Sequence, residues 1–199
     1  GVIITWFDLR SGFSNADIYS QRVISSGSVV WTSNGVPVCA TVNNQTYPML
    51  AGDGSGGAII TWQDTRSGIS NSDIYAQRVN SFGSTLWLSS GLSICSAASN
   101  QIIPIITSDG TGGAIIAWTD YRSQSTTGST LADIYAQRVN GSGNIEWSFN
   151  GLSVCTVTTD QTLPQIVSDG SNGALINWQD SRNGNWDIYS YDLVKKVEK

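Results

Sequence analysis

Four apolar segments recur along the chain, and each ends in the pattern Trp-x-Asp-x-Arg. The first runs over residues 2–10, and its copies run over 58–66, 114–122 and 174–182. The tryptophans of these segments are spaced 56, 56 and 60 residues apart: Trp6, Trp62, Trp118 and Trp178. Each segment is rich in β-branched and apolar residues, so it is expected to form a strand that is buried on both faces. A fixed period with strand chemistry predicts stacked copies of one all-β unit.

One repeat unit, followed from Gln101, contains four predicted strands. A short β-run at 104–108 leads through a glycine-rich turn into the apolar run at 114–118. The run at 133–139 alternates apolar and polar residues, and a fourth, broken strand begins at Ile145. No stretch shows the period of 3.6 residues that a helix requires. Four antiparallel strands in about 56 residues, repeated without helices, predict an all-β fold built from β-propeller blades.

The predicted first and last blades are incomplete. The chain begins at the second strand of one unit and ends near Val194, after the third strand of another, which gives 3, 4, 4 and 3 strands, or 14 in total. We expect blades at about 1–43, 44–99, 100–159 and 160–194, followed by a basic tail at 195–199. Three arrangements fit this count: a compact four-bladed ring, part of a larger propeller, or unfinished edges that pair between copies. We favour the ring.

Composition excludes several classes of protein. The net charge is −5, only 13% of residues are charged, and lysine occurs only in the basic tail, so nucleic acid is not an expected partner. No apolar run approaches the roughly 20 residues of a membrane span. No signal peptide is visible, so we expect a mature form or an excised piece. Cys39, Cys95 and Cys155 are one repeat position copied three times, and we expect free, buried thiols. There is no histidine, so no metal site and no cofactor are expected.

Most acidic and aromatic residues are repeat positions. The tryptophan after the second strand is expected to wedge between neighbouring sheets. The acid and arginine that follow it, such as Asp64 with Arg66 and Asp120 with Arg122, are expected to fix the loop between the second and third strands. Repeat positions account for 11 of the 15 acids. The remaining acids are Glu146, Asp160, Asp192 and Glu198. The sequence gives no reason to place two of these in one cleft, so we expect no catalytic residues and no enzyme.

The combined repeat resembles that of a known group of proteins. Asp-Gly-x-Gly-Gly-Ala-Ile-Ile-x-Trp-x-Asp-x-Arg, then Asp-Ile-Tyr-Ala-Gln-Arg-Val-Asn, then Trp-x-x-x-Gly, is similar to the blade repeat of secreted or cell-surface bacterial β-propeller proteins. The resemblance implies the fold and an extracellular or cell-surface location. It implies little about activity, because propellers carry many unrelated functions. The sialidase Asp box differs, since the tryptophan here comes nine residues after Asp109.

Candidate ligand contacts come from positions where the copies differ and from the links between blades. The loops between the second and third strands should share one face with these links, and Trp186 has no counterpart in the other copies. Exposed amides and aromatic rings suit glycans or peptides. The candidates are Trp186, Asn183, Asn185, Gln124, Thr126, Thr127, Gln45, Gln101 and Gln161.

The sequence therefore favours a non-enzymatic extracellular β-propeller that acts as a structural, assembly or adhesion module. Its expected partners are further copies bound through the unfinished blade edges, or the rest of a larger propeller; a glycan or a surface protein is a further candidate. The alternative is a glycan- or peptide-binding domain that uses the variable-loop face. A third hypothesis is a fragment of a glycoside-processing propeller enzyme.

Overall fold

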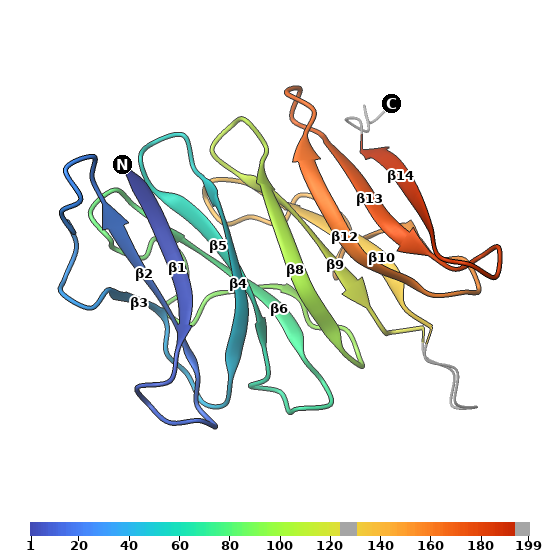
Figure 1. Ribbon diagram of the computed structural model, residues 1–199, viewed down its shortest axis with the longest axis horizontal. Coiled ribbons are helices and arrows are strands. Elements are labelled where there is room, and N and C mark those ends of the chain that lie inside the picture. Colours follow the sequence, from blue (N-terminus) through green and yellow to red (C-terminus); the bar gives the residue numbers. More distant parts are fainter. Residues whose placement is uncertain (124–130, 194–199) are drawn as a thin grey trace.

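The computed structural model describes residues 1–123 and 131–193, which form fourteen strands and no helix (Figure 1). Each strand is short, and consecutive strands are joined by tight turns or by longer loops. The strands are β1 (Val2–Asp8), β2 (Asp17–Val23), β3 (Val36–Cys39), β4 (Gln45–Gly52), β5 (Ala58–Asp64), β6 (Asp73–Val79), β7 (Leu92–Cys95), β8 (Gln101–Ser108), β9 (Ala114–Asp120), β10 (Asp133–Val139), β11 (Leu152–Cys155), β12 (Gln161–Ser168), β13 (Ala174–Asp180) and β14 (Asp187–Leu193).

The strands form four antiparallel sheets in chain order. The first sheet has the order β1-β2-β3, the second β4-β5-β6-β7, the third β8-β9-β10-β11 and the fourth β12-β13-β14. The prediction of an all-β, propeller-type fold with 3, 4, 4 and 3 strands is confirmed. The first sheet lacks the innermost strand of the repeat, and the fourth lacks the outermost one.

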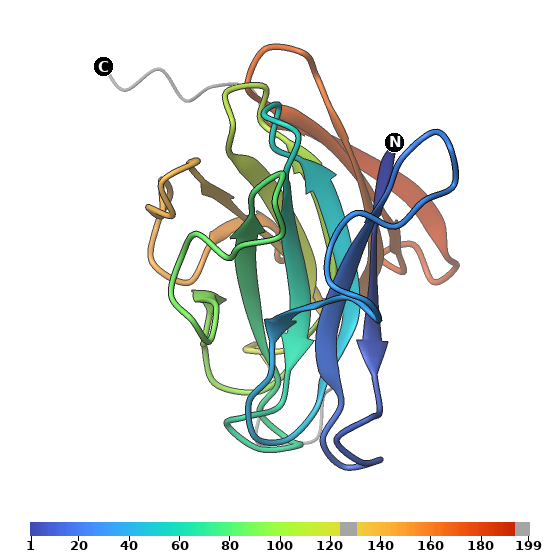
Figure 2. The ribbon, with the colours of Figure 1, turned by 90° about the vertical axis from the view of Figure 1, so that its left-hand side faces the viewer.

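The four sheets form an open array rather than a closed ring. The innermost strands contact one another in sequence, β1 with β4, β4 with β8 and β8 with β12. The first and fourth sheets lie at opposite ends, with the amino terminus at one end and β14 at the other (Figure 1). Figure 2 faces the free side of the first sheet, where Val2 and Ile4 are about half exposed. The expected ring is therefore wrong for this structure, because closure would cover these side chains. Packing against a larger propeller or a second copy stays a prediction.

Each sheet has a forward face, turned toward the next sheet along the chain, and a backward face, turned toward the previous one. The forward face of the third sheet carries Ile115 and Ile134, which pack on Ile176 and Trp178 of the backward face of the fourth sheet. Equivalent positions pack at the other two sheet interfaces. The second strand of a central unit lies between two interfaces, which explains why it is apolar at nearly every position.

The innermost strands differ from the prediction at their start. β8 begins at Gln101, three residues before the expected strand, and a bulge separates Ile102 from Ile105. Within it, Ile103 has a φ of 52°, in the left-handed region that branched residues rarely adopt. The reason is Pro104, which has no N–H for the ladder and therefore occupies a bulge. The same arrangement recurs in β4 and β12.

Candidate functional site

The recurring Trp-x-Asp-x-Arg residues form a closed hydrogen-bond network inside each unit. In the third unit, Trp118 Nε1 donates to Asp120 Oδ2 at 2.7 Å. Arg122 donates two hydrogen bonds to the same carboxylate, from Nε at 2.9 Å and from Nη2 at 2.6 Å. Its guanidinium lies 3.9 Å from the centre of the Tyr135 ring, and Nη2 also donates to the Asn150 carbonyl at 2.7 Å. Both oxygens of the buried Asp120 carboxylate are bound within the unit, so the network stabilises the loop.

The three cysteines are free and buried, as predicted. Each thiol lies beside an arginine of the following unit, as Cys39 Sγ does at 3.4 Å from Arg66 Nη2. Burial raises the pKa of both Cys39 and Cys95 to about 12; the smaller opposing effects come from Arg66 at Cys39, and from the backbone N–H of Ala97 and then Arg122 at Cys95. A thiol with such a pKa is protonated and unreactive at neutral pH, so these residues fill space between sheets.

The three link glutamines are not exposed, although their prediction as ligand contacts requires exposure. Gln45, Gln101 and Gln161 are fully buried. Gln101 Nε2 donates to the carbonyls of Ala98 and Ser99 at 3.3 and 3.2 Å, which holds the link in shape. The sequence did indicate this structural role, because a glutamine that occurs in all three links is a repeat position. Gln124, Thr126 and Thr127, also predicted as contacts, lie outside the described residues.

The loop between β13 and β14 places the remaining predicted residues at the surface. Asn183, Asn185 and Trp186 are all exposed, and 56% of Trp186 is accessible. Asn183 Nδ2 donates to Asp187 Oδ2 and to Tyr189 Oη, both at 3.0 Å. The indole and the two amides therefore lie within one short loop, around a carboxylate that the sequence did not single out.

Asp187 differs from its equivalents in the other units. Asp73 is buried and accepts a hydrogen bond from Ser67 Oγ at 2.7 Å, and burial raises the pKa of its carboxyl group. Asp17 and Asp133 are likewise buried. In the fourth unit asparagine replaces this serine, the loop is shorter, and Asp187 is exposed. Sequence reasoning missed Asp187 because it occupies a repeat position; the signal was the change in its neighbours.

A second carboxylate lies at the same edge of the fourth sheet. Gln161 of β12, Asp180 of β13 and Asp187 of β14 are directly opposite one another in register. Asp160 immediately precedes Gln161, is half-buried, and its backbone N–H donates to Ser181 Oγ at 3.2 Å. Its Oδ1 accepts the backbone N–H of Ala132 in the third unit at 3.1 Å, as the amide oxygens of the corresponding asparagines do in the other links. The backbones at Asp160 and Asp187 are thus separated by two inter-strand spacings, about 10 Å. The intervening Asp180 is fully buried and bound by its own arginine, which lowers the pKa of its carboxyl group to about 2.

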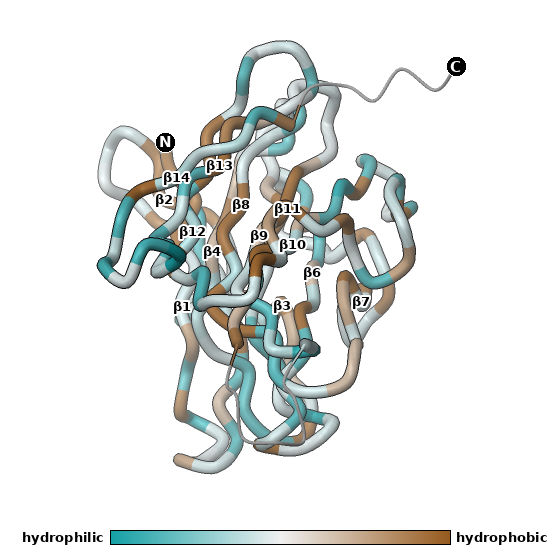
Figure 3. The backbone as a smooth tube through the Cα atoms, turned by 90° about the vertical axis from the view of Figure 1, so that its right-hand side faces the viewer, coloured by the Kyte–Doolittle hydropathy of each residue, from teal (hydrophilic) through white to brown (hydrophobic). Residues whose placement is uncertain are grey.

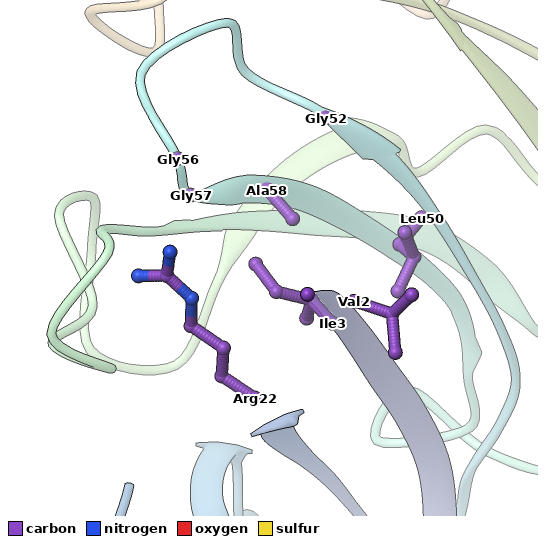
Figure 4. Close-up of a pocket in the computed structure, with 9 residues that line it drawn as sticks. Val2, Ile3, Arg22, Leu50, Gly52, Gly56, Gly57 and Ala58 are labelled. Atoms are coloured by element: carbon purple, nitrogen blue, oxygen red, sulfur yellow. The ribbon is translucent and has the colours of Figure 1, made fainter. Parts of the chain in front are cut away.

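Two shallow depressions lie elsewhere, and neither gathers acids. The first, of about 230 Å³, lies between the first two sheets beside Val2, Arg22 and Gly57 (Figure 4). The second, of about 270 Å³, is lined by Val38, Cys39 and residues of the second unit. Both are smaller than the roughly 300–1,000 Å³ of usual ligand pockets. The loop edge of the fourth sheet is therefore the candidate site, and it is an open surface.

Two classes of feature are absent from residues 1–123 and 131–193. There is no group of three or more histidine, cysteine, aspartate or glutamate residues placed to hold a metal ion. In the same residues there is no helix that could cross a membrane.

Comparison with known proteins gives a likeness of fold. No family model matches the chain, and no curated protein matches it. The endo-arabinase of Bacteroides thetaiotaomicron VPI-5482 superposes with a TM-score of 0.53 and 12% identity, covering 99% of this chain and 72% of that one. A GH43 endo-arabinanase from Bacillus licheniformis gives a TM-score of 0.48 and 16% identity, covering 98% and 70%.

The first of these structures corrects the expected function. The sequence favoured a non-enzymatic structural, assembly or adhesion module and predicted no enzyme. A solved structure that shares the fold of this chain at a TM-score above 0.5 is an endo-arabinase, which is an enzyme. Membership in the repeat does not keep an acid buried, because one copy of a repeat position, Asp187, is exposed while its equivalents are buried. At 12% identity the comparison shows that the chain has a β-propeller fold, and it shows nothing more specific.

Proposed function

We propose that the chain is part of a glycoside-processing β-propeller that acts on a neutral polysaccharide at the loop edge of the fourth sheet. The observation that carries this proposal is the exposed loop that brings the indole of Trp186 and the carboxylate of Asp187 to the same edge of the fourth sheet as Asp160. The shared fold with an endo-arabinase supports it. The resemblance of the repeat to secreted and cell-surface propellers supports a location outside the cell, where polysaccharides are found.

The spacing of the two carboxylates suits one type of glycoside hydrolysis. In inverting enzymes a carboxylic acid protonates the leaving oxygen, while a carboxylate activates a water on the opposite side of the sugar ring. These groups are about 6.5–9.5 Å apart, against about 5–5.5 Å in retaining enzymes. The backbones at Asp160 and Asp187 are two strand spacings apart, which leaves room for the wider, inverting separation of the carboxyl groups. Asp160 Oδ1 accepts the N–H of Ala132, so Oδ2 would be the oxygen that acts. Asp180 cannot take either role, because its buried oxygens already accept bonds from Trp178 and Arg182.

The surrounding side chains fit a sugar. An exposed indole offers a flat apolar surface for the faces of pyranose or furanose rings, and amides bind hydroxyl groups. Asn183 Nδ2 donates a hydrogen bond to Asp187. Asn185 is exposed, and its side chain makes no hydrogen bond to another side chain within residues 1–123 and 131–193. The loop therefore supplies a stacking surface, hydrogen-bonding groups and a positioned carboxylate.

Release of reducing ends from neutral polysaccharides tests the proposal. The protein is incubated with linear arabinan, xylan and galactan, and the anomer formed is followed by proton NMR. We expect hydrolysis with inversion, and a loss of at least about 100-fold in kcat for Asp187→Asn.

Asp160→Asn is an informative second variant, because asparagine occupies this position in the first two links, as Asn44 and Asn100. It should fold normally and lose activity to a similar degree. Glu146→Gln, which changes an exposed acid on the outer part of the third unit, is the matched control and should leave the rate unchanged. Absence of hydrolysis with all three polysaccharides, or full activity in both variants, would refute the proposal.

A further inference from the structure

Arg22 lacks the acidic partner that its equivalents bind. In the second unit Arg78 donates to Asp53 Oδ2 through Nε at 3.0 Å and through Nη2 at 2.9 Å. In the third unit Arg138 binds Asp109 Oδ2 through the same two nitrogens. Arg22 is half-buried, and within the described part of the chain it forms no ion pair, and its Nε and Nη2 donate to no other group. Two donors of its guanidinium are therefore open to a ligand.

The guanidinium of Arg22 is nevertheless held in place by its third nitrogen. Arg22 Nη1 donates to the Ser81 carbonyl of the second unit at 3.0 Å. Arg78 Nη1 makes the same contact one unit further along, to the Gly141 carbonyl at 2.8 Å. Because the two arginines share this contact, Nε and Nη2 of Arg22 face the place that Asp53 occupies in the second unit.

A backbone nitrogen at this site also has its repeat position. In the second unit the N–H of Gly57 donates to Asp53 Oδ1 at 2.8 Å. A Cβ added to Gly57 would lie 2.2 Å from the carbonyl oxygen of Val79, and a Cβ added to Gly1 would lie 2.4 Å from that of Val23, the equivalent residue. The backbone of Gly1 thus lies where the repeat places a glycine whose nitrogen binds a carboxylate.

These donors border the depression of about 230 Å³ between the first two sheets. Figure 4 shows Arg22 extending along one wall, beside the turn that contains Gly57. Leu50 of β4 forms another wall and is partly exposed, whereas its equivalent in the third unit, Ile106, is buried. The cluster that buries Ile106 includes Ala51 of the preceding innermost strand. An innermost strand in the first unit would cover Leu50 in the same way.

The depression lies beside a free strand edge. β5 and β9 each pair with strands on both sides, but β1 pairs only with β2 within residues 1–123 and 131–193. A free edge accepts a further strand through backbone hydrogen bonds. In the second unit Gly52, just before Asp53, is the Cα partner of Ala58, whose equivalent in the first unit is Val2. A strand added to β1 in this register brings its next residue to Arg22.

We infer that the depression beside Arg22 binds the aspartate carboxylate of an extended β-strand that ends in Asp-Gly and pairs with the free edge of β1. One carboxylate oxygen accepts a hydrogen bond from the nitrogen of Gly1, and the other accepts from Nε and Nη2 of Arg22. The other units identify the occupant, because they fill this place with the same side chain on the same kind of strand. The inference concerns a partner strand and does not rest on the proposed hydrolysis.

A second folded copy does not supply this carboxylate. The aspartates of the three Asp-Gly turns, Asp53, Asp109 and Asp169, each already accept the N–H of a glycine in their own turn. The site is also specific to the first unit: in the fourth sheet, which lies nearest the viewer in Figure 3, Asp192 replaces the arginine. The occupant is therefore a separate strand with the chemistry of the innermost strands of the repeat.

Fluorescence anisotropy of a labelled peptide tests the inference. The peptide has the sequence of residues 161–171, which contains the innermost strand and the Asp-Gly of the fourth unit. We expect it to bind, and asparagine in place of its aspartate should weaken binding by at least about tenfold, because charge-assisted hydrogen bonds are lost. Arg22→Gln should weaken binding of the aspartate peptide by a similar factor. Arg10→Gln removes an arginine from beyond the other end of β1, and as the matched control it should leave binding unchanged.

A double-mutant comparison separates loss of the ion pair from a change of fold. Arg22→Gln should bind the aspartate and asparagine peptides equally, because each change removes the same ion pair. The asparagine peptide leaves the protein unaltered, so it tests the ion pair even if Arg22→Gln does not fold.

Four results would overturn the inference. The first is absence of peptide binding, or equal binding of the two peptides to the unaltered protein. The second is an equal loss in Arg22→Gln and Arg10→Gln, or additive losses in the double-mutant comparison. The third is full displacement of the peptide by acetate at the concentration of the peptide, which would assign the site to a small anion. The fourth is sedimentation showing a dimer that Arg22→Gln dissociates, which would assign the edge to a second copy.

Discussion

Replacing Arg122 by leucine should destabilise the protein far more than the same change at Arg10. Both arginines occupy the same repeat position and bind the aspartate two residues earlier. Arg122 is mostly covered, and its partner Asp120 is completely buried. The side chains of Arg10 and Asp8 are 41% and 16% exposed. The leucine variant at 122 therefore leaves a carboxylate without its counter-charge inside the protein, whereas the variant at 10 leaves one that water can reach.

The expected cost can be worked out from the contacts that are lost. The guanidinium of Arg122 makes two hydrogen bonds to Asp120, one to the Asn150 carbonyl, and a stacking contact with Tyr135. Removal of one partner from a buried ion pair costs about 3–5 kcal/mol. Because part of the arginine reaches solvent, we expect the lower end, about 3 kcal/mol. For a chain of this size each kcal/mol lowers the Tm by about 2–4 °C, so the expected decrease is about 6–12 °C.

Urea unfolding followed by tryptophan fluorescence measures the effect. Stacked repeat units need not unfold in a single step, so far-ultraviolet circular dichroism should be recorded as a second probe. Arg10→Leu is the matched control and should show a clearly smaller shift of the midpoint. Equal losses in the two variants, or a loss below about 1 kcal/mol for Arg122→Leu, would refute the view that the buried network stabilises the unit.

Three further predictions test other parts of the fold. Gly151→Ala should lower the Tm by more than Gly54→Ala in thermal melts. Both glycines have positive φ values, but a Cβ at position 151 would lie 2.6 Å from the indole of Trp118, whereas a Cβ at position 54 would meet no atom within 4 Å. Acid should destabilise the fourth unit between about pH 4 and pH 2. The pKa of Asp180 is lowered to about 2 in the folded protein, so its ionised carboxylate stabilises the fold at pH values above the pKa of the unfolded chain, and this stabilisation is lost as the pH falls. Asp180→Asn should therefore flatten the acid limb of a curve of stability against pH. Native Cys39 and Cys95 should resist Ellman's reagent at pH 8 and react within seconds in 6 M guanidinium chloride; rapid native labelling would contradict their burial.

The repeat made the sheets predictable from sequence. Alternation of apolar and polar residues, the glycine turns and the recurring tryptophans specify the same strands in each copy, and the strand count was correct. The open array was not predictable, because the residues that decide it are those at the two end faces. Val2 and Ile4 are ordinary blade-interface residues in sequence, and only the structure shows that nothing within the described chain covers them.

The candidate site was predictable only in part. Trp186 and the neighbouring amides stood out because they broke the repeat, and the structure places them at the surface together. Asp187 was hidden, since its residue type matches the other copies while its exposure does not. Exposure depends on the length of the preceding loop and on the loss of a serine hydroxyl, which are changes at other positions. The link glutamines failed in the opposite way, because a polar residue was taken to be exposed when its amide is needed to bind backbone carbonyls.

The fourth unit shows how a repeat can acquire a site without losing its fold. Its backward face keeps Ile176 and Trp178, which bury against the third sheet, so the unit is held in place by the same contacts as the others. Within residues 1–123 and 131–193 no sheet covers its forward face, and the departures from the repeat lie on this face and the loop edge: Trp186 for alanine or serine and Asp192 for arginine. Such changes would be costly at an interface between two of the described sheets, because they would leave buried groups unpaired. Exposed carboxylates and an exposed indole can therefore accumulate on this one sheet, and the proposed chemistry follows from the same asymmetry that leaves the array open.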